Sequence, residues 1–325
     1  MKKLLYLASA LTFLYACKEQ TTDNNQRIID VPTLSPTTAS EEQAHITQAK
    51  DLLTLAENQA KSGTIDIKQY EEIVKNLTSA IEKNDRVAET YALRGWVKMR
   101  LAQPEEALKD YQHALALDPN TVPALTGRGA LYESQNKYTE ALADFDKALS
   151  TRPNDASVLN NRGALKRKMK RFSEALADYT QAVNLDNNNV LMYLNRANTL
   201  IDLKKYKEAK IDYDVALGLN PQYALAYAGR ANAFYQLAQY EEAVKDYDAA
   251  IKIQPNYADA WRNRGYNKFK LGKNEDALED LTKALNLKNQ DKLAYQFRSA
   301  VYKKMNRNAE AEADLAKSLT DVIGM

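Results

Sequence analysis

The sequence is poor in the residues that build most chemical sites. It contains one cysteine and two histidines, His45 and His113, in 325 residues. A single cysteine forms no intrachain disulfide, and the two histidines lack the spacing of metal ligands. The chain also has no glycine-rich phosphate loop and no nucleophile motif. We therefore expect a protein that is not an enzyme and that needs no metal or cofactor.

The chain also lacks an excess of either charge. It has 45 Lys and Arg residues against 43 Asp and Glu residues, a formal net charge of +2. Removal of an N-terminal segment that carries Lys2 and Lys3 would bring this charge to about zero. Because phosphate binding requires a basic surface, nucleic acid is not an expected partner.

What the sequence does contain is a 34-residue period. Seven copies follow one another without insertion over residues 88–325, which is typical of repeat proteins. Position 20 is alanine in every copy, from Ala107 to Ala311. Position 8 is always small, and position 24 is aromatic or leucine: Tyr111, Phe145, Tyr179, Tyr213, Tyr247, Leu281 and Leu315. A small residue in the middle of a helix indicates that a neighbouring helix approaches closely there.

The ends of the helices are also marked in each copy. Proline stands at position 32 in four copies, where a second helix has to stop: Pro119, Pro153, Pro221 and Pro255. Position 19 is acidic in all seven, as expected for the first turn of that helix. Each copy is therefore predicted to be two antiparallel helices that turn near positions 15 and 16.

These positions resemble the tetratricopeptide repeat family over residues 88–325. The resemblance implies an all-α fold, a right-handed superhelical solenoid of antiparallel helix pairs. It further implies a concave face lined mainly by first helices, and a role in holding peptides or other proteins. It identifies no particular partner, because the family motif describes packing.

Two charged series run through all seven copies. Position 7 is arginine and position 23 is aspartate in every copy, from the pair Arg94 and Asp110 to the pair Arg298 and Asp314. The two positions lie at similar heights in an antiparallel helix pair, and a guanidinium can hold a carboxylate through two hydrogen bonds. We interpret these residues as a structural lattice and not as a row of ligand-binding arginines.

The candidate binding residues are those that differ between copies. In the family that the chain resembles, positions 2, 5, 9, 12 and 13 of the first helix, and sometimes position 6, face the groove. Here they supply Trp96, Met99, Asn160, Asn161, Arg167, Lys168, Asn195, Asn198, Asn232, Tyr235, Arg262, Asn263, Tyr266, Phe269 and Gln296. Asn side chains can bond an extended peptide backbone, and Trp, Tyr and Arg are frequent anchors. The alternative, that the Asn residues only satisfy neighbouring helices, stays open. The set does not reproduce the family's carboxylate clamp, so capture of a C-terminal carboxylate is not expected.

The N-terminus has the pattern of a bacterial lipoprotein signal. Lys2 and Lys3 precede an apolar run over residues 4–16, which is too short to span a bilayer. The sequence Leu14-Tyr15-Ala16-Cys17 resembles a lipobox, which predicts a signal peptide over 1–16 and lipidation of Cys17. An ordinary signal peptide and a short anchor helix are the alternatives.

By resemblance to lipoprotein sorting, an Asp directly after the lipidated cysteine would favour the inner membrane. Lys18 stands there instead, which favours the outer membrane. Both faces of that membrane stay open. Residues 17–40 are rich in Thr, Asn, Ser and Pro, which predicts a disordered tether.

The two ends of the array are expected to be atypical. Residues 41–87 keep part of the periodic pattern and are predicted to form a degenerate N-terminal capping repeat. The last copy is either its own cap or, through Leu315 and Leu319, an interface with a second copy of the chain.

The function expected from these patterns is a non-catalytic protein-interaction scaffold. It would be lipid-anchored to the outer membrane and would support an envelope, secretion or surface-assembly complex. One alternative is a lipoprotein that captures nutrient glycans, although the repeats contain no long insertion to build a sugar site. The other alternative is a regulator of cell-wall enzymes.

Overall fold

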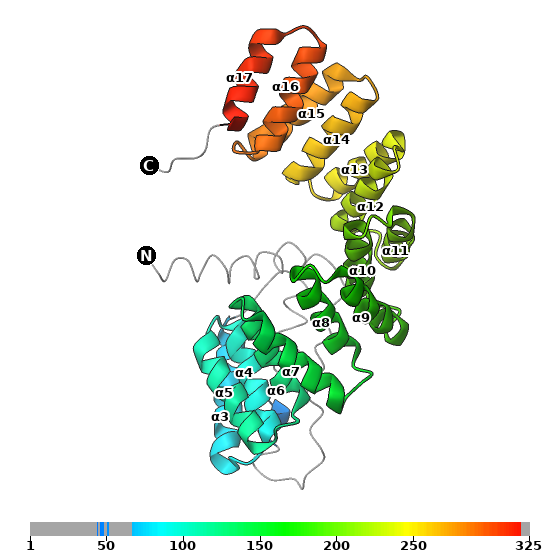
Figure 1. Ribbon diagram of the computed structural model, residues 1–325. Helices are drawn as coiled ribbons and strands as arrows, with labels where there is room; N and C mark the ends of the chain where they lie inside the picture. The colour runs from blue at the N-terminus through cyan, green and yellow to red at the C-terminus, as the bar shows by residue number, and fades with distance from the viewer. Residues whose placement is uncertain (1–43, 45, 49–50, 52–66, 320–325) are drawn as a thin grey trace. The chain divides into compact units, whose positions relative to one another are not determined.

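The computed structural model describes residues 44, 46–48, 51 and 67–319, and every regular element of the residues that it describes is an α-helix. These residues form two compact units that divide the chain between Met192 and Tyr193. The labelled helices (Figure 1) are α3 (Ile67–Lys83), α4 (Ala88–Arg100), α5 (Pro104–Leu117), α6 (Val122–Ser134), α7 (Tyr138–Thr151), α8 (Ala156–Lys168), α9 (Phe172–Leu185), α10 (Val190–Asp202), α11 (Tyr206–Leu219), α12 (Ala224–Gln236), α13 (Tyr240–Ile253), α14 (Ala258–Lys270), α15 (Asn274–Leu287), α16 (Lys292–Lys304) and α17 (Asn308–Leu319).

Each 34-residue copy, called here repeat 1 (residues 88–121) to repeat 7 (residues 292–325), forms one helix pair. The first helix covers positions 1 to 13, and the second helix begins at position 17 in every repeat. Within each unit, consecutive helices contact one another both inside a repeat and between repeats (Figure 1). The predicted fold class, an all-α solenoid of antiparallel helix pairs, is confirmed.

The turn inside each repeat is the same throughout. The N–H at position 16 donates to the carbonyl five residues earlier. In repeat 1, for example, the Gln103 N–H donates to the Lys98 carbonyl at 2.9 Å. This is the bond of a Schellman motif, which requires a left-handed residue at position 15. That residue has a φ of 55° to 78° in all seven repeats, yet only Gly272 is a glycine. Ala102 and Lys170 are among the others.

In repeats 1 to 6, the side chain at position 24 lies at the centre of the core. Tyr111 of α5 is 1% exposed and lies against glycines on two first helices. A Cβ added to Gly95, in the same repeat, would be 2.8 Å from the Tyr111 ring, and one added to Gly127, in the next repeat, would be 2.4 Å from it. The predicted close approach at position 8 is confirmed, and the contact with position 6 of the next repeat extends it.

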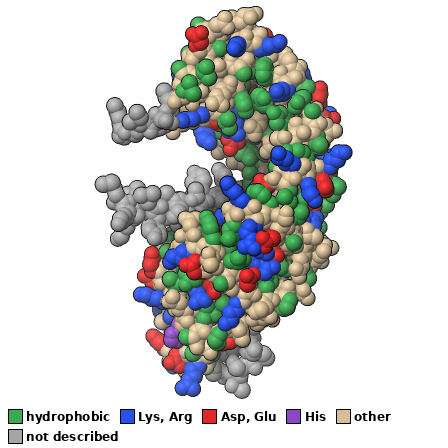
Figure 2. Space-filling view, in the orientation of Figure 1, with side chains coloured by type: hydrophobic (Ala, Val, Ile, Leu, Met, Phe, Trp, Pro, Cys, Tyr) green, Lys and Arg blue, Asp and Glu red, His purple; other side chains and the backbone are tan. Residues whose placement is uncertain are grey.

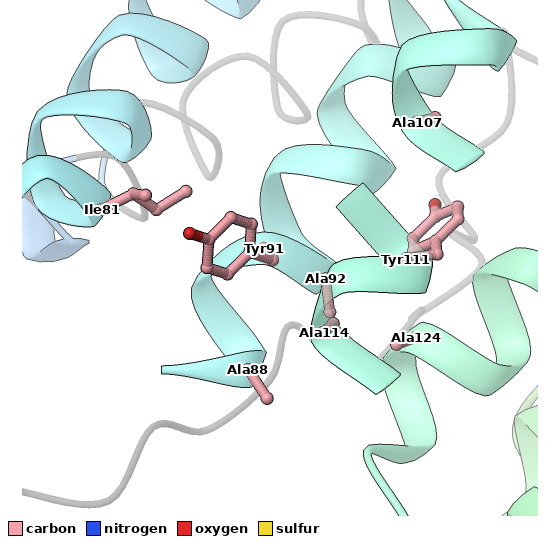
Figure 3. Packing of buried hydrophobic residues seen from close by; sticks show 8 residues of the cluster. All are labelled: Ile81, Ala88, Tyr91, Ala92, Ala107, Tyr111, Ala114 and Ala124. Atoms are coloured by element: carbon pink, nitrogen blue, oxygen red, sulfur yellow. The ribbon is translucent and has the colours of Figure 1, made fainter. Parts of the chain in front are cut away.

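Alanines complete this packing. Ala107 and Ala114 lie on the same helix as Tyr111, and Figure 3 shows Ala114 beside Ala92 of α4 and near Ala124 of α6. The ring of Tyr91 points in the other direction, toward Ile81 of α3 (Figure 3). One hydrophobic cluster therefore joins α3 to both helices of repeat 1 and to the first helix of repeat 2.

Helix α3 packs onto repeat 1 as the second helix of a further repeat would. Its buried residues Tyr70, Ile73 and Leu77 form a cluster with Leu93 and Val97 of α4. The other predictions for the N-terminal part, namely the signal peptide over 1–16, Cys17 and the tether over 17–40, lie outside the described residues. Most of the first half of the predicted cap does as well.

Gly229 and Gly218 provide a test of the ring-on-glycine packing. A Cβ at Gly229 would lie 2.5 Å from two ring atoms of Tyr213, a side chain only 1% exposed, whereas a Cβ at Gly218 of α11 would meet nothing within 4 Å. We expect Gly229→Ala to lower the free energy of unfolding by about 1–3 kcal/mol through overpacking. Gly218→Ala should raise it by about 0.5–1 kcal/mol because alanine favours the helix.

Chemical denaturation followed by circular dichroism measures both changes. Equal effects of the two substitutions would contradict the packing described for Tyr213.

Candidate functional site

The arginine and aspartate series pair one to one. In every repeat the arginine Nε donates to the aspartate Oδ2 at 2.6–2.9 Å, and Nη2 donates to Oδ1 at 2.6–2.8 Å. The aspartate side chains are almost fully buried, with 2% exposed in Asp280 and 9% in Asp144. These residues connect the two helices of a repeat, as the sequence predicts for a structural lattice.

The remaining guanidinium nitrogen connects neighbouring repeats. Nη1 of Arg162 donates to Asp146 at 2.7 Å, and Nη1 of Arg264 donates to Asp248 at 2.6 Å. Each acceptor stands 16 residues before its arginine, on the second helix of the preceding repeat. Arg298 reaches Thr282 at 3.1 Å in the same way. The sequence interpretation did not include this second partner, because position 25 varies among Asp, Thr and other residues.

Aromatic rings and lysines complete the surroundings of the guanidinium. The Cζ atom of Arg264 lies 4.5 Å from the ring centroid of Trp261, a cation–π distance. Lys268 forms a further ion pair with Asp280, with 2.9 Å between Nζ and Oδ2. In repeat 2, the hydrogen bond to Asp144 outweighs burial and raises the pKa of Arg128. Each of these arginines is therefore held by a buried aspartate, which leaves it little capacity for a ligand.

The pair in repeat 5 offers a direct test of the lattice. Arg230→Leu would leave Asp246 as an unpaired buried charge, so we expect it to lower the free energy of unfolding by about 3–5 kcal/mol. The double variant Arg230→Leu/Asp246→Leu should be less destabilised than Arg230→Leu alone, because no uncompensated charge remains. Arg230→Lys keeps the charge but loses the two-pronged geometry, and should lie between the wild type and Arg230→Leu.

Denaturation of the wild type, Arg230→Leu, Asp246→Leu and the double leucine variant gives the coupling free energy of the pair. Additive effects of the two single changes to leucine would show that the pair does not act as a unit.

The predicted binding residues of the N-terminal unit are spread over two repeats. Trp96 and Met99 are half-buried on α4, where each packs against a core cluster, and the Arg100 guanidinium lies 4.7 Å from the Trp96 ring centroid. On α8, Asn160 is buried, Asn161 and Arg167 are half-buried, and Lys168 is exposed. Lys168 forms an ion pair with Glu133 of α6 at 2.6 Å, which joins two neighbouring first helices.

In the C-terminal unit, two of the predicted asparagines bond to buried tyrosines. The Tyr213 hydroxyl donates to Asn198 Oδ1 at 2.6 Å, and the Tyr247 hydroxyl donates to Asn232 Oδ1 at the same distance. Burial raises the pKa of Tyr247. A hydroxyl buried without a partner is costly, so these asparagines support packing as well as presenting an amide NH2 group. Asn195 is half-buried on α10.

Arg262 is held by two carboxylates. Its Nη1 donates to Asp259 and to Asp291, both at 2.7 Å, and its Nε donates to Asn263 Oδ1 at 3.1 Å. Asp291 also caps α16 by accepting from the Ala294 N–H at 3.1 Å. Arg262 therefore connects repeat 6 to the start of repeat 7, in addition to lying at a predicted binding position.

The remaining predicted residues of this unit gather in one place. We call the rings of Tyr235, Tyr266, Phe269 and Phe297 the aromatic surface. They come from α12, α14 and α16, and all four are half-buried. The Tyr266 ring lies 4.1 Å from that of Phe297 in a stacked arrangement, 5.7 Å from that of Tyr235 and 6.3 Å from that of Phe269.

Phe297 is the member of this surface that the sequence interpretation missed. It stands at position 6 and was not among the candidates, whereas its neighbour Gln296 was, and Gln296 is exposed on α16. Burial and a hydrogen bond to Tyr266 raise the pKa of Tyr235 to about 12. Tyr235 thus presents a neutral hydroxyl beside its ring at ordinary pH.

Charges of both signs are interspersed over the face drawn in Figure 2. Among the described residues, no helix combines the length and apolarity needed to cross a membrane, and no three potential metal ligands gather in one place. Leu315 and Leu319 of α17 are 48% and 69% exposed. Leu281, which matches Leu315 in repeat 6, is fully buried. The homo-oligomer through this end stays a prediction.

Family models match five of the repeats at the boundaries set by the helix pairs. Models described as tetratricopeptide repeat match residues 88–121, 122–155, 156–189, 190–223 and 258–291, and a model described as TPR repeat matches residues 231–270. The chain belongs to the tetratricopeptide repeat family. Membership of this family supports a role in protein–protein interaction.

Solved structures show the same fold at low sequence identity. PilF of Pseudomonas aeruginosa is 20% identical, with 69% of this chain and 98% of that chain covered and a TM-score of 0.58. A tetratricopeptide repeat protein from Parabacteroides merdae is 19% identical, with 80% and 98% covered and a TM-score of 0.55.

A chain of the APC/C hetero-tetramer Cut9–Hcn1 is 17% identical, with 96% of this chain and 60% of that chain covered and a TM-score of 0.58. No curated protein matches the chain significantly in sequence. At these identities the similarities concern the fold alone.

Proposed function

We propose that the protein is a non-catalytic scaffold that binds a peptide or protein segment along the first helices of its repeats. We further propose that a lipid on Cys17 anchors it to the bacterial outer membrane, where it supports an envelope, secretion or surface-assembly complex. The observation that carries the first part is a division of roles among residue positions. Residues that recur in every repeat are used for packing, whereas the variable first-helix residues are mostly half-buried or exposed.

Position 7 illustrates the first role and position 9 the second. Every arginine at position 7 is bound to an aspartate in its own repeat. Position 9, in contrast, is occupied by Trp96, Ala130, Ala164, Asn198, Asn232, Tyr266 and Ala300. None of these seven side chains is buried. Trp96 and Tyr266, for example, are half-buried, and Asn232 is exposed. Apart from changes of Asn198 and Asn232, which also bond to buried tyrosines, we expect changes at this position to alter recognition more than the fold.

The anchoring proposal is supported by the sequence. Cys17 is the only cysteine, and it follows an apolar run of the length found in signal peptides. A diacylglyceryl group carries two acyl chains, which stable membrane attachment requires. Lys18 supports the outer membrane over the inner one by resemblance to lipoprotein sorting.

Site-specific photo-crosslinking in the native cell tests the binding surface. We expect a photoreactive residue in place of Gln236 or Gln296, both exposed on first helices, to form a covalent adduct with one and the same polypeptide. The same residue in place of Lys245 or Lys283, both exposed on second helices, should not form that adduct. Mass spectrometry of the adducts identifies the segment.

Adducts that form equally from both sets of positions would place binding elsewhere. No adduct from either first-helix position would remove the support for a scaffold that uses this surface.

Replacement of Cys17 tests the anchor. Cys17→Ser removes the thiol that would carry the lipid, so we expect the protein to leave the membrane fraction and to lose metabolic labelling by an alkyne-bearing fatty acid. Lys18→Asp, the matched variant, should keep the label but move the protein from outer-membrane to inner-membrane fractions on a density gradient. Labelling of Cys17→Ser at the wild-type level would exclude this lipidation site.

A further inference from the structure

The aromatic surface of the C-terminal unit has a rigid base. Phe269 and Phe297 pack against the buried cluster of Ala277, Leu281 and Val301, while Tyr235 packs against the cluster that contains Tyr247. The rings are thus held from below and partly exposed above. Preorganised aromatic rings bind apolar side chains at a low cost in conformational entropy.

Lysines border this surface at the ends of the first helices. The Lys270 Nζ lies 5.1 Å from the ring centroid of Tyr266, and Lys270 is itself exposed. Lys304 occupies the matching position of repeat 7, seven residues or about two helical turns after Phe297, so it lies on the same side of α16. Lys303 is also exposed beside it.

The nearby carboxylates are already paired with other cations. Asp280 is bound by Arg264 and Lys268, and Asp291 is bound by Arg262. Asp259, the one acidic residue at positions 2, 5, 9, 12 and 13 of repeats 5 to 7, is also bound by Arg262. Within the described part of the chain, Lys270, Lys303 and Lys304 therefore form no ion pair, and their positive charge is available to a partner.

We propose that the aromatic surface together with Lys270, Lys303 and Lys304 binds an acidic peptide segment that carries an aromatic or large apolar anchor residue. This inference rests on the proposed function and specifies the chemistry of the partner. The anchor contacts the rings of Tyr266 and its neighbours, and the carboxylates of the peptide face the three lysines.

The size of the surface sets the length of the segment. The rings come from three successive first helices, and packed helices lie about 8–10 Å apart. Two such steps span about 20 Å, which an extended peptide covers with about six residues at about 3.3 Å per residue. One anchor and several carboxylates fit within this length.

Selection from a random peptide library by the purified full-length protein tests this inference. We expect the enriched peptides to carry a net negative charge and at least one Phe, Tyr, Trp or Leu. Binding of a fluorescently labelled enriched peptide, measured by anisotropy, should weaken at least tenfold in Lys270→Glu/Lys304→Glu and weaken as salt is added. The matched double variant Lys245→Glu/Lys283→Glu, changed on exposed parts of second helices, should bind within twofold of the wild type.

Tyr266→Ala should also weaken binding at least tenfold, while Tyr266→Phe, which keeps the ring, should lose much less. Enrichment of neutral or basic peptides, or an acidic selection that is unchanged by Lys270→Glu/Lys304→Glu, would overturn the inference. A selection in which no enriched peptide depends on these residues for binding would also overturn the inference.

The photo-crosslinking experiment separates this outcome from the proposed function. Adducts at first-helix positions with a segment that is not acidic leave the scaffold in place and refute only the acidic partner.

Discussion

The arrangement of the repeats depends on the guanidinium at position 7. Two of its nitrogens hold the aspartate of the same repeat, and where the third has an acceptor it holds the second helix of the preceding repeat, as in Arg230 with Asp246 and Asp214. Three helices are thus related by one planar group whose geometry permits little rotation or sliding. Hydrophobic packing brings the helices together, and this charged contact sets their register.

The same constraint explains where recognition can develop. In repeats 1 to 6, residues at positions 7, 8 and 24 are enclosed by neighbours, so their replacement changes the fold. Residues at positions 12 and 13 of the first helix meet fewer constraints, and in repeats 5 to 7 most of them are aromatic or basic. The aromatic surface arises because Tyr235, Tyr266 and Phe297 stand at different positions of successive helices and still come into contact.

The period alone predicts the helix pairs and the pairing of Arg94 with Asp110, because both depend on features present in all seven copies. Features carried by only some copies escaped prediction. The bond from Tyr213 to Asn198 depends on a residue type that only some repeats have at position 9, and Phe297 becomes visible only through its stacking on Tyr266. The left-handed conformation at position 15 was not predicted for another reason. Six of the seven residues there are not glycine, so the sequence does not indicate it. Their conformation follows from the Schellman hydrogen bonds and not from local preference.

The spacing of the arginine partners has a consequence for how such a chain can grow. Both acceptors lie 16 residues from the guanidinium, one before it and one after it, so they fall within one period on either side. Duplication of a whole repeat that has an acceptor at position 25 therefore supplies the new arginine with both acceptors. Insertion of half a repeat would instead place an arginine beside the wrong helix, away from its carboxylates. Repeat 5 is a suitable template, because Asp246 serves its own arginine and Asp248 serves the next one, Arg264. Lengthening by complete modules is thus compatible with the electrostatics of the array, and lengthening by fragments is not.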